Sequence, residues 1–137
     1  MIKVLIAEDS PVNRELLREL LEMRGFEVSE ACDGLEALTQ VDKVRPDLLV
    51  LDIGMPGLDG FGVIQKLRAN PEYAELPVLA ATAYAMRGDR EKILEAGFDG
   101  YISKPINAPV LQEAIDQLKK ARKTSAPSSA KAAGAAI

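Results

Sequence analysis

The chain has 137 residues, of which 47% are hydrophobic and 28% charged, a composition typical of one folded globular domain. Its net charge of −4 argues against a nucleic-acid binder that neutralises phosphates. Histidine is absent, which excludes Ser-His and Cys-His catalysis and histidine zinc sites. One cysteine permits no internal disulfide, no apolar run approaches the ~20 residues of a membrane span, and the amino-terminal segment lacks a signal-peptide pattern. We therefore expect a cytoplasmic protein without a membrane partner.

Five short segments are predicted to be β-strands. Three of them, 4–7, 48–51 and 78–81, are apolar throughout, as parallel strands covered by helices on both faces require. Segments 26–31 and 101–103 mix polar and apolar residues, which suits strands at the edges of a sheet.

The first two predicted helices carry apolar residues at helical spacing. The first begins at Ser10, a good N-cap, and ends near Gly25. Its expected core-facing stripe consists of Val12, Leu16, Leu17, Leu20, Leu21 and Met23. The second begins at the cap Asp33, which has capping-box spacing to Glu36. Its expected core residues are Leu35, Leu38 and Val41.

The other three predicted helices differ in how well they are anchored. The third covers about residues 59–69, and the fourth about residues 86–96. The fourth is the weakest, because Gly88 interrupts it. Its expected anchors are Ile93 and Leu94. The fifth begins near Asn107, and its expected core residues are Val110, Leu111, Ala114, Ile115 and Leu118.

The alternation of five strands with five helices predicts an α/β fold with a doubly wound parallel sheet. Edge positions for the second and fifth strands fit the flavodoxin-like order 2-1-3-4-5. Residues 1–123 form the predicted domain. Residues 124–137 are rich in Ala and Ser without periodicity, so we expect them to form a flexible tail.

Polar residues follow the predicted strands at their carboxyl ends, where such sheets bind ligands. They are Glu8, Asp9, Asp52, Thr82 and Lys104. Each alone is most simply a helix cap, a turn residue or a solvated side chain, but together they predict one pocket. Carboxylates so close need a shared proton or a cation, and oxygen ligands favour Mg²⁺, with Mn²⁺ as an alternative. Such a site suits phosphoryl transfer, with a carboxylate as the nucleophile.

These residues lie within motifs of a known family. Over residues 2–123 the chain resembles bacterial response-regulator receiver domains of two-component systems. The resemblance is carried by Glu8-Asp9, the segment LDIGMPGLDG at 51–60, Ala81-Thr82-Ala83, and the segment YISKP at 101–105. The stretch TAYAMRGDREKILEAGFDGYISKPI is most similar to DivK-type single-domain regulators and to receivers of hybrid kinases.

The resemblance implies a metal-dependent phosphoacceptor. Asp52 would accept the phosphoryl group. Asp9, Asp52 and the backbone carbonyl of Gly54 would bind Mg²⁺ directly, and Glu8 would act through a water molecule. Gly54 itself departs from the larger side chain that many members place there. The missing side chain would alter the access of water to a phosphoryl group on Asp52 and therefore the lifetime of that group.

The resemblance also implies roles at the fourth and fifth strands. Lys104 would pair with a phosphoryl oxygen, and the Lys104–Pro105 peptide bond would be cis. Thr82 and the backbone N–H of Ala83 would hydrogen-bond the phosphoryl group. Tyr101 matches the family's switch aromatic.

The implied function is a stand-alone switch rather than an enzyme with a separate substrate. A sensor histidine kinase or a histidine phosphotransfer protein would phosphorylate Asp52. Thr82 and Tyr101 would then change the surface formed by the fourth helix, fifth strand and fifth helix, which controls an unidentified partner. One alternative is a Mg²⁺-dependent hydrolase with an aspartyl phosphate, although Gly54 stands where such phosphatases usually place a second acid. Another is an unphosphorylated receiver-like scaffold, which the complete acid set disfavours.

Overall fold

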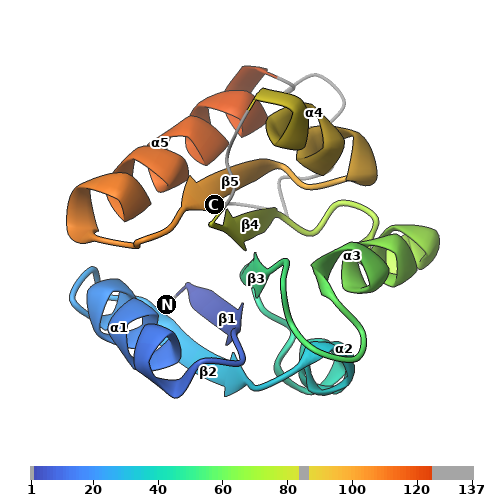
Figure 1. The fold of residues 1–137 in the computed structure, drawn as a ribbon, viewed down its shortest axis with the longest axis horizontal. Helices are drawn as coiled ribbons and strands as arrows, with labels where there is room; N and C mark the ends of the chain where they lie inside the picture. Colours follow the sequence, from blue (N-terminus) through green and yellow to red (C-terminus); the bar gives the residue numbers. More distant parts are fainter. Residues whose placement is uncertain (1, 84–86, 125–137) are drawn as a thin grey trace.

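The computed structural model describes residues 2–83 and 87–124. Five parallel strands form one sheet in the order β2-β1-β3-β4-β5, which confirms the predicted fold and its edge strands (Figure 1). The strands are β1 (Lys3–Ala7), β2 (Glu27–Ala31), β3 (Leu48–Asp52), β4 (Val78–Thr82) and β5 (Gly100–Ser103). The helices are α1 (Pro11–Glu22), α2 (Gly34–Val44), α3 (Gly60–Ala69), α4 (Arg87–Ala96) and α5 (Ala108–Thr124), with an unpredicted 3-10 turn, η1 (Pro71–Tyr73).

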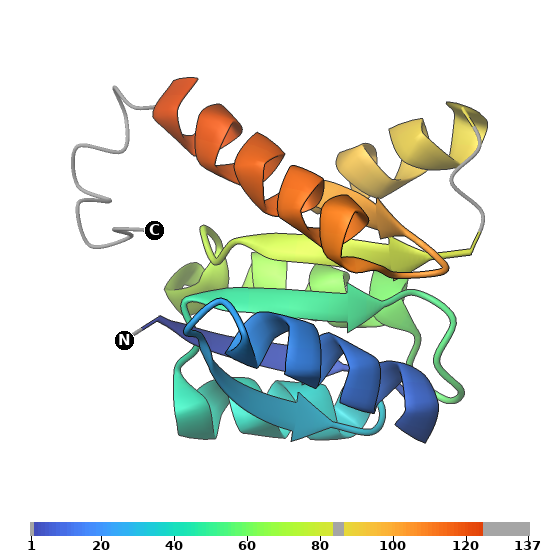
Figure 2. The same cartoon turned by 90° about the vertical axis from the view of Figure 1, so that its left-hand side faces the viewer.

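Helices cover both faces of the sheet. α1 and α5 lie on one face, and α2, α3 and α4 lie on the other (Figures 1 and 2). Within β1, Leu5 and Ala7 pack in the cluster beneath α2 and α3, whereas Val4 and Ile6 pack in the cluster beneath α1 and α5. Successive side chains of a strand point to opposite faces, so a strand between two helix layers must be apolar at every position.

Local caps begin four of the helices where the sequence predicts. In each case a side-chain oxygen accepts a hydrogen bond from the backbone N–H three residues later, at 2.8–3.3 Å. The capping residues are Ser10, Asp33, Asp59 and Asn107. Because a cap involves only neighbouring residues, the sequence alone predicts these boundaries.

The predicted apolar stripe of α1 is partly wrong. Leu17 and Leu21 are the buried residues of the helix. Val12 and Met23 are 76% and 81% exposed, and Leu16 is also exposed. At about 100° per residue, these three lie within about 40° of one another, on the side turned away from the sheet. We call Val12, Leu16 and Met23 the α1 stripe.

Two predicted anchors on other helices are also wrong. Leu35 is exposed, because it lies about 200° around α2 from the buried Ala37. Leu94 is exposed on α4, where the adjacent Ile93 occupies the core position. The helix α4 runs without a break through Gly88. Its predicted first residue, Met86, lies outside the described residues.

The fifth helix largely agrees with its prediction. Four expected core residues are buried and Val110 is half-buried; the buried ones are Leu111, Ala114, Ile115 and Leu118. The helix ends at Thr124, and residues 125–137 lie outside the described part of the chain, so the domain boundary and the tail stay predictions. Within the described ranges, no helix has the length and apolarity needed to cross a membrane.

Candidate functional site

The carboxyl ends of the central strands bring the predicted polar residues to one edge of the sheet. Glu8 and Asp9 directly follow β1, and Asp52 ends β3. Asp52 pairs in register with Ala81, so Thr82 at the end of β4 lies one position beyond it. Parallel strands all point the same way (Figure 2), and residues distant in sequence therefore meet at this edge.

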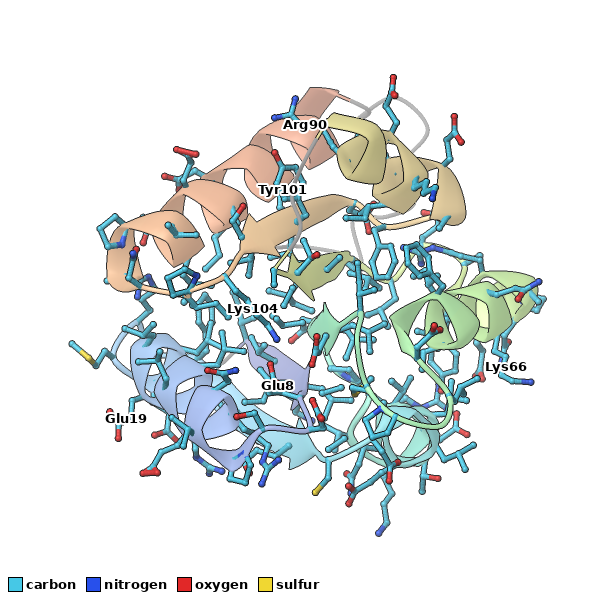
Figure 3. The ribbon with its side chains drawn as sticks, in the orientation of Figure 1. Glu8, Glu19, Lys66, Arg90, Tyr101 and Lys104 are labelled. Atoms are coloured by element: carbon cyan, nitrogen blue, oxygen red, sulfur yellow. The ribbon has the colours of Figure 1, made fainter. Side chains whose placement is uncertain are left out.

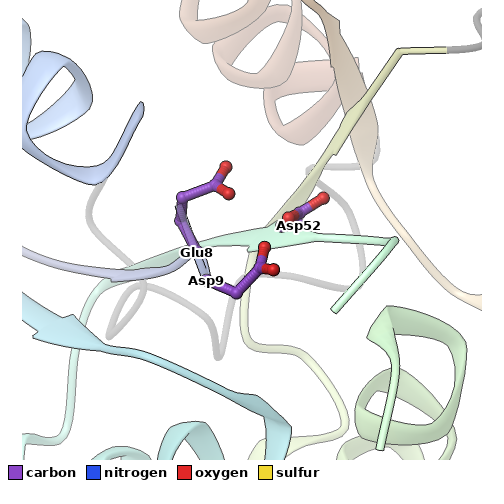
Figure 4. Close-up of side chains that lie close together, drawn as sticks. All are labelled: Glu8, Asp9 and Asp52. Carbon is purple, nitrogen blue, oxygen red and sulfur yellow. The ribbon is translucent and has the colours of Figure 1, made fainter. Parts of the chain in front are cut away.

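Three carboxylates and one ammonium group form the centre of the site. Glu8, Asp9 and Asp52 each present an oxygen within 4.8 Å of the others (Figure 4). Glu8 is only 1% exposed and Asp52 only 5%, whereas Asp9 is exposed. Lys104 Nζ lies 3.2 Å from Glu8 Oε1 and 3.2 Å from Asp52 Oδ1, so it bridges the two buried carboxylates (Figure 3).

The environment keeps Asp52 and Lys104 ionised. Burial alone would raise the pKa of Asp52, but the backbone N–H of Gly54, which donates to Oδ1 at 3.1 Å, and the ammonium of Lys104 lower this pKa below its usual value. Burial would likewise lower the pKa of Lys104, and the negative charges of Asp52 and Glu8 raise it instead. The site therefore presents an ionised carboxylate against a cation.

Glu8 behaves differently from Asp52. Burial raises its pKa to about 7, and the nearby Asp52 carboxylate adds to the rise, although the N–H of Ser10 donates to Oε2 at 3.1 Å and opposes it. Oε1 is buried and accepts no hydrogen bond in the described structure, even with Lys104 beside it. One ammonium group is thus insufficient for the buried negative charge that this site would carry.

The remaining predicted residues surround this centre. Thr82 is buried, and its carbonyl accepts a hydrogen bond from the Lys104 N–H at 2.8 Å. The Lys104–Pro105 peptide bond is cis, the form that the family resemblance predicts. Ala83 is exposed directly after Thr82. Tyr101 lies further along the sheet on β5, half-buried and in contact with α4 (Figure 3).

Comparison with known proteins decides which family uses this arrangement. The family model described as the response regulator receiver domain matches residues 4–116. The chain belongs to the response regulator receiver family. The polar-differentiation response regulator DivK of Brucella anthropi is 43% identical over 112 residues, which are 82% of this chain and 91% of that protein. DivK of Brucella ovis is 42% identical with the same coverage.

Solved receiver structures share the fold. The chemotaxis response regulator CheY4 of Vibrio cholerae superposes with a TM-score of 0.81 at 30% identity, over 86% of this chain and 98% of that one. The receiver domain of the sensor histidine kinase PA1611 of Pseudomonas aeruginosa, solved with a magnesium ion in its active-site cleft, gives 0.74 at 34% identity, over 82% and 92%. The chain is thus a receiver domain of bacterial two-component signalling.

The acidic cluster of this receiver fits the divalent cation that the family binds. Its potential ligands are carboxylate oxygens, which are hard donors and prefer Mg²⁺ to softer metals. Within the described residues, Oε1 of Glu8 accepts no hydrogen bond, and the carboxylates outnumber the one ammonium group beside them, so the cluster can accommodate a further positive charge. We therefore regard Glu8, Asp9 and Asp52 as the candidate metal centre.

Sequence analysis missed a residue that positions this centre. Arg14 reaches from α1 back to β1, where Nη1 donates to the backbone carbonyl of Glu8 at 2.8 Å. Its Nε also lies 3.3 Å from Glu30 Oε1 on β2. Arg14 therefore holds the turn after β1 against the edge strand. No local motif marks it, because both contacts depend on how α1 packs.

The raised pKa of Glu8 predicts that the metal-free receiver loses stability as the pH rises. The folded state keeps the Glu8 proton up to about pH 7, whereas the ordinary pKa of a free glutamate side chain is 4.5. The contribution of Glu8 to the free energy of unfolding is therefore largest below about pH 4.5. It falls by on the order of 3 kcal/mol as the pH rises from there through the folded-state pKa. Urea unfolding in EDTA at about pH 5 and about pH 8 measures the change. In Glu8→Gln most of this change between the two pH values should disappear. The assignment is contradicted if wild type and Glu8→Gln lose the same stability between about pH 5 and about pH 8.

Proposed function

We propose that this receiver is a phosphorylation switch that accepts a phosphoryl group from a partner phosphohistidine onto Asp52. The observation that carries the proposal is the state of Asp52 itself. It is ionised, almost fully buried, and 3.2 Å from the Lys104 ammonium. An ionised carboxylate beside a fixed cation is a nucleophile next to a group that neutralises the incoming phosphate.

The acidic cluster is the proposed Mg²⁺ centre of the switch. Asp9 and Asp52 would bind the ion directly, with the carbonyl of Gly54 as a third protein ligand and Glu8 acting through water. When bound, the ion supplies positive charge beside the transferring oxygens. The magnesium ion in the cleft of the receiver of PA1611, which is 34% identical, supports this assignment.

The transfer is a direct displacement at phosphorus. An Asp52 oxygen forms the new O–P bond, the N–P bond to the donor histidine breaks, and the ring nitrogen keeps the electron pair. Lys104 offsets charge on the phosphoryl oxygens, and Thr82 and the Ala83 N–H donate hydrogen bonds to them. Water later cleaves the acyl phosphate, which releases inorganic phosphate and restores Asp52.

Phosphorylation would act on the face formed by α4, β5 and α5. It adds about −1.5 to −2 charges at Asp52, which draws the Thr82 hydroxyl inward. Space beside Thr82 then lets Tyr101 turn inward and changes the surface that a partner reads. α4 is the element that moves most easily, since Ile93 is its single buried hydrophobic residue among those whose burial is described.

The DivK relatives support a receiver that acts without a fused output domain. The matched region spans 91% of those regulators, so they are little more than a receiver. A hydrolase is less consistent with the site, because the second residue after Asp52 is Gly54 rather than an acid. A scaffold that is never phosphorylated leaves the ionised Asp52–Lys104 pair without a purpose.

Intact-mass measurement with a small phosphodonor tests the proposal. Wild type incubated with Mg²⁺ and acetyl phosphate should gain one phosphoryl group of about 80 Da, the charged group of a phosphoprotein. Hydroxylamine should remove the adduct, because it cleaves acyl phosphates. Rapid turnover of many small phosphate esters would favour the hydrolase. Neither adduct nor turnover would favour the scaffold and overturn the switch.

The α1 stripe is the proposed docking surface for the phosphohistidine protein. α1 begins two residues after Asp9, so a donor whose histidine reaches Asp52 must cover the start of this helix. Val12→Gln should slow phosphotransfer from such a donor about fivefold, the loss of ~1 kcal/mol at an interface residue. The rate with acetyl phosphate, which needs no docking, should not change. Leu94→Gln, exposed on α4, is the matched control, and slowing by both variants contradicts the assignment.

The open position at Gly54 predicts a short-lived phosphate. A Cβ at position 54 would meet nothing closer than Asp52 Oδ1 at 4.0 Å, so a side chain can begin there without moving the backbone. Gly54→Met should shield the acyl phosphate from water and lengthen its lifetime several-fold. The decay of the phosphorylated mass after removal of acetyl phosphate measures the lifetime. An unchanged or shorter lifetime would show that Gly54 does not control the access of water.

A further inference from the structure

One exposed arginine on α4 makes two contacts with the predicted switch aromatic. Arg90 Nε donates a hydrogen bond to the Tyr101 hydroxyl at 2.9 Å. The Arg90 guanidinium carbon also lies 5.4 Å from the centroid of the Tyr101 ring (Figure 3). A cation over a ring face is attracted by the ring quadrupole, and the hydrogen bond fixes the hydroxyl. Together the contacts hold the hydroxyl and the ring of the tyrosine side chain.

These contacts join α4, which has little buried surface, to β5, which lies at the edge of the sheet. Among the α4 residues whose burial is described, Ile93 is the only buried hydrophobic one, and it packs in the cluster that Tyr101 partly joins. β5 is an edge strand, and within residues 2–83 and 87–124 it pairs with β4 alone. Arg90 is therefore a polar tie between a loosely anchored helix and an edge strand, placed at the residue that would have to move between them.

Tyr101 is also one wall of a hollow on the surface. The hollow has a volume of about 240 Å³ and lies between β5 and the first turns of α5. Its other lining residues are Ser103, Pro109, Val110, Glu113 and Ala114. A rotation of the tyrosine ring would remove this wall, so the shape of the hollow depends on whether Arg90 keeps hold of Tyr101.

We propose that Arg90 is a latch that holds Tyr101 outward in the unphosphorylated receiver and couples the position of α4 to the shape of the hollow. The inference builds on the proposed switch, because Tyr101 can turn inward only after it leaves Arg90. A contact made in one conformation and absent from the other biases the equilibrium toward the first. Loss of the Arg90 side chain should therefore release Tyr101 without any phosphoryl group.

Fluorine NMR on protein labelled with 3-fluorotyrosine tests the latch. The chain has three tyrosines, and Tyr101→Phe identifies the Tyr101 signal by its disappearance. In unphosphorylated Arg90→Ala the Tyr101 signal should shift away from its wild-type position, toward the position it takes in wild type with Mg²⁺ and acetyl phosphate. Arg90 is exposed, so its replacement leaves the core intact.

Lys92→Ala is the matched control, since it removes an exposed cation from the same helix. It should leave the Tyr101 signal at its wild-type position. The latch is overturned if the signal of Arg90→Ala coincides with that of wild type, if it shifts away from the phosphorylated position, or if Lys92→Ala shifts it equally. Failure of the proposed function gives a different result, because wild type then acquires no phosphoryl mass with acetyl phosphate, whatever Arg90→Ala does.

Discussion

Asp52→Asn should leave the receiver unable to accept a phosphoryl group. The amide keeps the shape of the side chain but removes the ionised oxygen that attacks phosphorus. Lys104 retains Glu8 as a partner at 3.2 Å, so the variant should fold. With Mg²⁺ and acetyl phosphate, intact mass should show no adduct under conditions that convert wild type completely.

Asp59→Asn is the matched control for this loss. Asp59 is another aspartate of the segment after β3, but its carboxylate caps α3 by accepting from the Gly62 N–H at 2.9 Å. Asparagine caps helices as well as aspartate does, so this variant should be phosphorylated like wild type. An adduct on Asp52→Asn at the wild-type rate would move the acceptor role to another residue, with Asp9 the first to examine.

The fold could be predicted because its determinants are local or repetitive. Caps such as Ser10 and Asp33 involve residues three apart, and the apolar run of β1 reflects two helix layers rather than any particular partner. The site could be predicted for a related reason. Once the strands are parallel, their carboxyl ends must share one edge, and that edge places Asp9 near Asp52 although 42 residues separate them.

Other features depend on packing and leave no local pattern. The residues Glu8 and Asp9 are adjacent acids, yet one is 1% exposed and the other lies open to solvent. Burial raises the pKa of Glu8. The two residues follow β1, and their side chains leave the backbone in different directions (Figure 4). Arg14 and Arg90 likewise gain their roles from contacts between elements, which sequence spacing does not encode.

The errors on the helices share one cause. Periodicity reports which residues lie on one side of a helix, but it does not say whether that side faces the sheet or a partner protein. Met23 lies at helical spacing from Val12 and Leu16, and Leu94 lies next to the core residue Ile93, yet both are exposed. A stripe that is apolar without being buried is a candidate contact surface, and on α1 such a stripe begins at Val12, three residues after Asp9 of the acidic cluster.

Gly34→Ala should destabilise the receiver strongly, although alanine usually favours a helix. A Cβ at position 34 would lie 2.1 Å from the carbonyl oxygen of Leu58, an atom of the backbone. The first turn of α2 must therefore move away from the loop that follows Asp52, or that loop must move. We expect the free energy of unfolding to fall by about 3 kcal/mol, as for an overpacked core. Urea unfolding followed by circular dichroism measures it.

Gly54→Ala separates this steric clash from a general effect of adding a methyl group. Its Cβ meets only Asp52 Oδ1 at 4.0 Å, so its free energy of unfolding should stay within about 0.5 kcal/mol of wild type, as for most surface changes. Gly34→Ala should also slow phosphorylation by acetyl phosphate, because the displaced loop contains Gly54, whose N–H holds Asp52. Wild-type stability in Gly34→Ala would mean that α2 can move away from Leu58 at no cost. If Gly34→Ala is destabilised but is phosphorylated at the wild-type rate, then the loop keeps its position and the first turn of α2 moves instead.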